Sequence, residues 1–172
     1  MLMAIFILKL FSVITVITLL LSGYLKFDPM GMQHALFALP TLLLIYTNEI
    51  LTIFYFIQTG KEVKDSAEEE NIELPLLAEI RKNHGTASKG ATINLILITV
   101  AAVFASTTVF PGWGPKTHGI IALLCSALYI KETFSSYKYL WKNSEYMNEF
   151  AERFWDQVAD SSNSSGKDKL EE

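Results

Sequence analysis

The chain has 172 residues, of which 51% are hydrophobic, and its formal net charge at pH 7 is −4. It has no basic face, which argues against a nucleic-acid-binding protein. The single cysteine, Cys125, excludes a framework of disulfides within the chain and any CxxC metal-binding or haem-attachment motif. The charges are spread unevenly, and the long segments that carry almost none are typical of a membrane protein.

Residues 1–25 form the first apolar segment, with Lys9 as its only charge. A bilayer core about 30 Å thick is crossed by about 20 helical residues, so this segment is long enough to span it. The alternative is a secretory signal peptide. Because the segment has no basic region before its apolar stretch and no small-x-small cleavage site where one is expected, we predict a retained transmembrane helix.

Three further segments predict transmembrane helices. Residues 35–58 carry only Glu49, and residues 91–110 carry no charge. The last segment, at about 118–140, is interrupted by two adjacent charges. Its uncharged part is too short to cross a bilayer alone, and the third helix needs a partner, so we place the fourth span there.

We therefore predict an all-α, polytopic membrane protein of four transmembrane helices, arranged as two tandem helical hairpins at 1–58 and 91–140. Residues 59–90 are expected to form a charged connector between the hairpins. Residues 141–160 predict a cytoplasmic amphipathic helix, and the polar residues 161–172 predict a disordered tail.

The segment 141–160 has an acidic face and an apolar stripe. An interfacial membrane anchor would favour more Lys and Arg, so the stripe is expected to bind a partner instead. That partner would be another membrane subunit or a second copy of this chain. The stripe consists of Met147, Phe150, Phe154 and Val158.

The basic residues set the expected orientation, because Lys and Arg near the spans accumulate on the cytoplasmic side. The loops after the first and third spans contain only two basic residues, Lys26 and Lys116. Both termini and the connector are therefore predicted to face the cytoplasm, with His34 and His118 on the outer side. The basic residues on the predicted cytoplasmic side are Lys61, Lys64, Arg81, Lys82, Lys89, Lys142, Arg153, Lys167 and Lys169.

The first and second halves of the sequence resemble each other, with matching residues separated by a constant number of positions. Residues 14–16 match residues 98–100, and His34 matches His118, each histidine opening an apolar segment. We infer a duplicated two-helix hairpin. Because each unit crosses the membrane twice, the two copies would share one orientation and be related by an axis along the membrane normal.

Polar side chains form a predicted inner layer, toward the cytoplasmic ends of the spans. Ionisable groups inside a bilayer are costly unless paired, and they mark candidate functional sites. One interpretation is a structural cluster, for instance with Lys9 paired to Glu49. The other is a proton or cation site on the axis of the bundle. The predicted members are Lys9, Glu49, Asn94 and Glu132.

The outer layer contains His34 and His118, with Met30 and Met32 in the loop before the second helix. Two histidines at equal depth on facing helices are suited to hold one b-type haem from both sides. The run Met-x-Met-x-His offers soft ligands for copper as an alternative. In the third interpretation each histidine is structural and hydrogen-bonds loop carbonyls at a helix N-terminus.

The segments IRKNHGTASKGATINLILITVAAVF and GWGPKTHGIIALL resemble small b-type cytochrome membrane domains, including the cytochrome b561-like group. In those domains one histidine opens a helix and another opens the next. The corresponding residues here are His84 and His118, and His34 opens the second helix similarly. The resemblance implies transmembrane electron transfer with haem b held by paired histidines. Two haems would need four histidines and the chain has three, so one haem is expected, between His34 and His118.

Three functions are consistent with these features. The first is a b-type haem electron-transfer protein using His34 and His118. The second is a non-catalytic accessory subunit of a larger membrane complex, whose polar layers are structural. The third is a transporter of protons, ions or small solutes using Glu49 and Glu132. No phosphate-binding glycine loop or nucleophile elbow is present, so nothing indicates hydrolytic or transferase activity.

Overall fold

The computed structural model describes residues 1–26, 29–31, 33–69, 76–106 and 115–168, and its regular elements are all helices. The four α-helices are each long and apolar enough to cross a membrane. This confirms the predicted all-α class with four helices of membrane-spanning length. The elements are α1 (Leu2–Leu25), the 3-10 helix η1 (Pro29–Gly31), α2 (His34–Glu69), α3 (Leu76–Ser106) and α4 (Pro115–Asp168).

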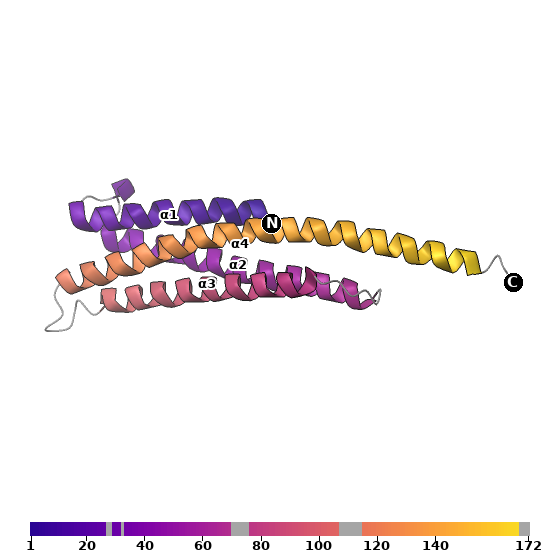
Figure 1. Cartoon of the computed structure of the whole chain (residues 1–172). Helices are drawn as coiled ribbons and strands as arrows, with labels where there is room; N and C mark the ends of the chain where they lie inside the picture. The colour runs from indigo at the N-terminus through magenta and orange to yellow at the C-terminus, as the bar shows by residue number, and fades with distance from the viewer. Residues whose placement is uncertain (27–28, 32, 70–75, 107–114, 169–172) are drawn as a thin grey trace.

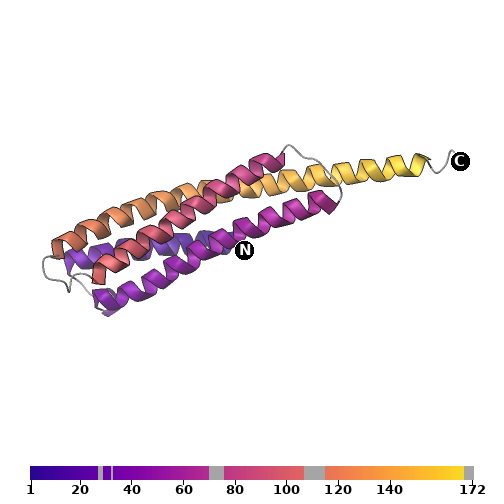
Figure 2. The same cartoon turned by 90° about the horizontal axis from the view of Figure 1, so that it is seen from below.

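The helices form an elongated bundle in which each packs against the next in the chain and α4 also packs against α1. They run side by side along one long axis (Figure 1, Figure 2). At 1.5 Å per residue, α1 is about 36 Å long and α4 about 81 Å. Beyond the N-terminus of α1, the bundle therefore continues as α2, α3 and α4 only (Figure 1).

The helix boundaries have local causes in the sequence. Helix α1 ends at Lys26, which adopts the left-handed conformation (φ 56°) that commonly terminates a helix. Helix α4 begins at Pro115, where the missing amide hydrogen costs nothing because it would have no partner inside the helix. No glycine or proline occurs between Gly119 and Gly166, so nothing in that stretch interrupts α4.

Two predicted boundaries differ from the structure. The connector predicted at 59–90 consists largely of the last turns of α2 and the first turns of α3. The amphipathic helix predicted at 141–160 is an unbroken continuation of α4, which also includes the first part of the predicted tail, up to Asp168. Charge increases sharply in these segments, but a change in charge does not end a helix. Residues 70–75 and 169–172 lie outside the described residues.

The membrane half of the bundle places large apolar side chains outside and polar side chains inside. Leu39, Leu43 and Phe54 are each at least 60% exposed. Lys9 and Glu49, in contrast, are fully buried. This distribution suits a lipid environment, because polar atoms that face hydrocarbon would lack hydrogen-bond partners.

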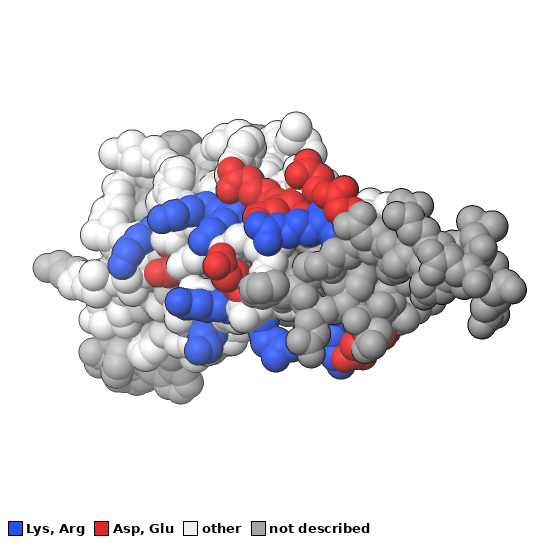
Figure 3. All heavy atoms as spheres, turned by 45° about the vertical axis from the view of Figure 1, so that its right-hand side comes forward, with Lys and Arg blue, Asp and Glu red and all other residues white. Residues whose placement is uncertain are grey.

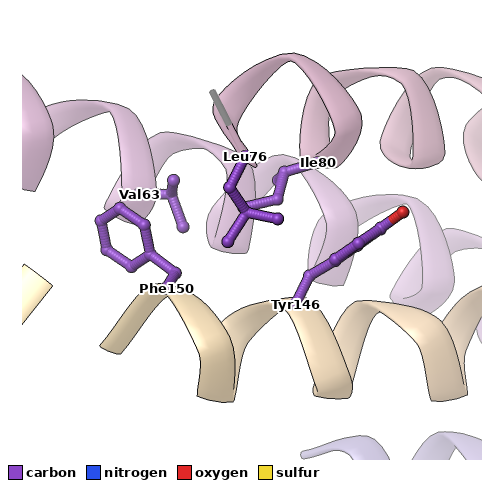
Figure 4. Packing of buried hydrophobic residues seen from close by; sticks show 5 residues of the cluster. All are labelled: Val63, Leu76, Ile80, Tyr146 and Phe150. Atoms are coloured by element: carbon purple, nitrogen blue, oxygen red, sulfur yellow. The ribbon is translucent and has the colours of Figure 1, made fainter. Parts of the chain in front are cut away.

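Beyond α1, an apolar cluster joins the three remaining helices. Val63 of α2, Leu76 and Ile80 of α3, and Tyr146 and Phe150 of α4 pack together (Figure 4). Met147 and Phe154, two further residues of the stripe predicted to bind a partner, lie against the same cluster and are partly buried. The binding of a partner through this stripe stays a prediction. The fourth member, Val158, lies outside the described side chains.

Candidate functional site

The inner polar layer centres on a buried ion pair. Lys9 Nζ of α1 lies 3.3 Å from Glu49 Oε1 of α2, and both side chains have no exposed surface. Asn94 of α3 donates its Nδ2 hydrogen to the same Glu49 oxygen at 3.0 Å. Three of the four predicted members of the inner layer are therefore in contact. The pairing compensates part of the cost of placing charge inside a membrane bundle.

Glu132, the fourth predicted member, does not join this group. Its side chain is half-buried, and a Cβ placed on Gly90 of α3 would lie 3.6 Å from Glu132 Oε2. It forms no ion pair within the described part of the chain. The two glutamates that the repeat relates therefore occupy different environments, one paired with Lys9 and one near the surface of the bundle.

Further buried polar side chains surround the ion pair. Tyr129 OH of α4 lies among the side chains of Ser12, Asn48 and Thr133, which can hydrogen-bond to it. Asn94 Oδ1 is buried and has no hydrogen-bond partner within the described residues. We refer to Lys9, Asn48, Glu49, Asn94 and Tyr129 as the central polar cluster.

The outer layer contains His34, which contacts α1 through Ser22. Ser22 Oγ lies 2.7 Å from His34 Nδ1 and 2.8 Å from the Leu19 carbonyl oxygen. In the tautomer that places the imidazole hydrogen on Nδ1, the serine accepts that hydrogen and donates its own to Leu19. That tautomer has a lone pair on Nε2, which is the form in which histidine binds a metal.

The His34 ring packs directly on α1. A Cβ placed on Gly23 would lie 3.0 Å from His34 Cε1 and 3.5 Å from Nε2. The missing side chain at Gly23 thus makes room for the imidazole. The sequence analysis predicted neither this contact nor the role of Ser22, because both depend on which face α1 turns to α2.

His118 lies at the same end of the bundle, in the first turn of α4. Its Nδ1 atom is buried and has no hydrogen-bond partner in the described part of the chain. The two imidazoles are close enough to interact electrostatically. Tyr24 of α1 donates its hydroxyl hydrogen to the Gly119 carbonyl at 3.0 Å, so the end of α1 contacts both histidine-bearing helices.

The donors present in the outer layer are two imidazoles, which is a set that could hold a haem. No group of three or more His, Cys, Asp or Glu side chains that could hold a metal ion occurs among the described residues. The copper hypothesis also needs Met32, which lies outside the described residues, and Met30, whose side chain is not described.

His84 lies at the opposite end of the bundle from the other two histidines, in an aromatic and amide environment. Its Nε2 atom donates to Asn143 Oδ1 of α4, and Asn143 Nδ2 donates to Tyr55 OH at 3.2 Å. The ring lies 5.3 Å from that of Phe56, and a Cβ placed on Gly60 would lie 2.7 Å from His84 Nδ1. The sequence analysis assigned this histidine no partner. The regular spacing of Leu140, Asn143 and Tyr146 along α4 is the signal that places Asn143 on the buried face.

Comparison of the chain with protein-family models, with curated proteins and with solved structures gives no match.

Proposed function

We propose that this protein is a membrane-integral b-type cytochrome that holds one haem between His34 and His118 and transfers electrons. The observation that carries the proposal is the arrangement of these two imidazoles. They lie at one end of the bundle, in the first turns of α2 and α4. Ser22 Oγ lies 2.7 Å from His34 Nδ1, and with the imidazole hydrogen on Nδ1 the Nε2 atom is available as a ligand.

The roles of the residues follow from these contacts. His34 and His118 would hold the haem, and Ser22 would orient the His34 ring through its contact with Nδ1. Haem, when bound, supplies a one-electron couple between its ferric and ferrous states. Tyr24 holds the start of α4 against α1 and so positions His118. The apolar outer surface of the bundle keeps the site within the bilayer.

The proposal includes a finer architecture. Helices α1 and α2 form one hairpin and α3 and α4 its repeat, as in the cytochrome b561-like resemblance. Both termini face the cytoplasm, following the positive-inside rule. The haem then lies toward the outer side, and the charged ends of α2, α3 and α4 lie inside.

An absorption spectrum of the purified full chain, reconstituted with haem, tests this proposal. We expect b-type bands in the reduced-minus-oxidised spectrum that disappear in His34→Ala and in His118→Ala. His84→Ala is the matched control and should keep the bands, because His84 lies at the other end. Ser22→Ala should keep the bands but weaken haem affinity by about 10–100-fold. Bands that survive both His34→Ala and His118→Ala would exclude this site.

A second candidate function, proton or ion transport, is favoured by the central polar cluster. Ionisable groups buried inside a membrane protein commonly mark a proton or ion path. The polar side chains around Glu49, among them Asn48 and Tyr129, could pass hydrogen bonds to transported protons or water. Proteoliposomes containing the protein should then show a proton flux that Glu49→Gln abolishes. If neither haem nor flux is found, the remaining proposal is an accessory subunit of a larger membrane complex.

A further inference from the structure

A groove lies between α2 and α3 at the end of the bundle opposite His34 and His118. Its cavity volume is about 470 Å³. Two glycines help to open it, Gly60 from α2 and Gly85 from α3. A Cβ on Gly85 would have no atom within 4 Å, so the space beside it is free. We refer to this site as the α2–α3 groove.

The lining of the groove is mostly apolar, with charged side chains toward its outer end. Phe56 and Ile57 line the end nearer the membrane half, and Val63, Leu77 and Ile80 continue the apolar lining outward. The charged lining residues are Lys64, Glu68 and Arg81. Lys64 lies 3.4 Å from Glu68, but both side chains are more than 60% exposed, so this pair is weak. Arg81 forms no ion pair within the described residues. Two of the three charged side chains in the described lining are therefore basic.

The position of the groove matches the surface of a bilayer. Ile5, near the start of α1, packs in one cluster with Phe56 and Ala87, so the groove begins at the level where α1 starts. From Phe56 to Lys64 the helical rise is about 12 Å, roughly the depth of a headgroup layer beyond the hydrocarbon core. Figure 3, with this end turned forward, shows Lys and Arg side chains gathered among Asp and Glu. The positive-inside rule assigns this end to the cytoplasm.

We propose that the α2–α3 groove binds one anionic glycerophospholipid of the cytoplasmic leaflet. Lys64 and Arg81 contact its phosphate, and an acyl chain follows Ile57 and Phe56 toward the bilayer. Charge complementarity selects an anionic headgroup, since basic sites between membrane helices attract such lipids. The apolar lining selects a lipid over a soluble anion, because a soluble anion would leave Phe56, Ile57 and Leu77 uncovered. The inference is independent of haem binding.

Native mass spectrometry of the full chain in detergent tests this inference, with phosphatidylglycerol and phosphatidylcholine as probes. The wild-type chain should retain one phosphatidylglycerol more tightly than phosphatidylcholine. The double variant Lys64→Gln, Arg81→Gln should lower the affinity for phosphatidylglycerol by roughly tenfold or more, because two basic contacts are lost. The matched control is Lys61→Gln, Lys82→Gln, which removes the same charge from exposed positions on the same helices outside the groove.

A second variant tests the groove by shape rather than by charge. Gly85→Leu places a side chain in free space, so it should fill the groove without disturbing the helices, and bound lipid should be lost. Equal losses in both charge variants would mean general surface attraction and would overturn the proposal. Retention of lipid by Gly85→Leu, or complete displacement of the lipid by millimolar inorganic phosphate, would overturn it as well.

Discussion

Lys9 is the only charged residue of α1, and the structure buries it completely against Glu49. Removing two charges from water costs several kcal/mol for each ion, and their attraction compensates this only when the geometry is good and the remaining atoms are hydrogen-bonded. Here Asn94 satisfies one carboxylate oxygen. The pair therefore contributes to the pairing of α1 with α2, whether or not it also moves protons.

Removal of one partner of the Lys9–Glu49 pair is expected to lower the free energy of unfolding more than removal of both partners. Lys9→Met alone leaves Glu49 buried without its counter-ion, and the expected loss of stability is about 3–5 kcal/mol. The double variant Lys9→Met, Glu49→Gln should recover much of this loss. Circular dichroism of unfolding in detergent measures the difference.

Arg153→Met is the matched control, because the Arg153–Glu149 pair is exposed. It should change stability by less than about 1 kcal/mol. A Lys9→Met protein as stable as the wild type would show that the ion pair does not hold α1 in place.

For individual residues, the sequence predicted the level of a side chain along the bundle better than it predicted which other side chains it contacts. Counting helical rise from the ends of the spans placed Lys9, Glu49 and Asn94 at one level, and they are in contact. Glu132 was predicted at the same level, but its side chain lies near Gly90 of α3 and not near Glu49. The periodicity of a helix gives the level and approximate face of a side chain, but not the rotation of its neighbours. The Ser22–His34 and Asn143–His84 contacts could not be predicted for the same reason.

Among the elements, α4 departs most from expectation. Its sequence changes from apolar to charged, and we predicted that the helix continues as an amphipathic segment to 160 and gives way to a disordered tail. Helix formation depends on backbone hydrogen bonds and on the absence of breakers, not on polarity, so the helix continues. Its charged part is held by apolar contacts with α2 and α3.

Phe150→Ala should detach this part of α4 from its neighbours. Phe150 is only 6% exposed, and truncation of a buried phenylalanine costs about 3–5 kcal/mol. Amide hydrogen exchange in the last turns of α2 and the first turns of α3 should accelerate on the order of a hundredfold. Trp155→Ala, at a position 66% exposed, should leave exchange unchanged. Equal exchange in both variants would show that the cluster does not stabilise these turns.

For the whole molecule, apolar length predicted the number of membrane-spanning helices correctly, because the bilayer imposes one simple requirement on each. The links between spans were harder to predict. In the charged segments outside the apolar spans, hydrophobicity gives no such requirement. Packing against the rest of the chain decides whether such a segment is a loop or a helix.

The orientation of the whole molecule can be measured with single cysteines. In a Cys125→Ser background, Lys26→Cys should react with a membrane-impermeant thiol reagent in intact cells. Lys82→Cys should react only after the membrane is opened. The physical reason is the concentration of basic residues at the Lys82 end. Labelling of Lys82→Cys alone in intact cells would reverse the proposed topology.

The unbroken course of α4 has a mechanical consequence. His118 and Phe150 belong to one helix and are separated by about 48 Å of continuous hydrogen-bonded backbone. Such a rod tilts as a unit, so a small angular displacement near His118 becomes a larger sideways displacement at the far end of the helix, where Tyr146 and Phe150 lie.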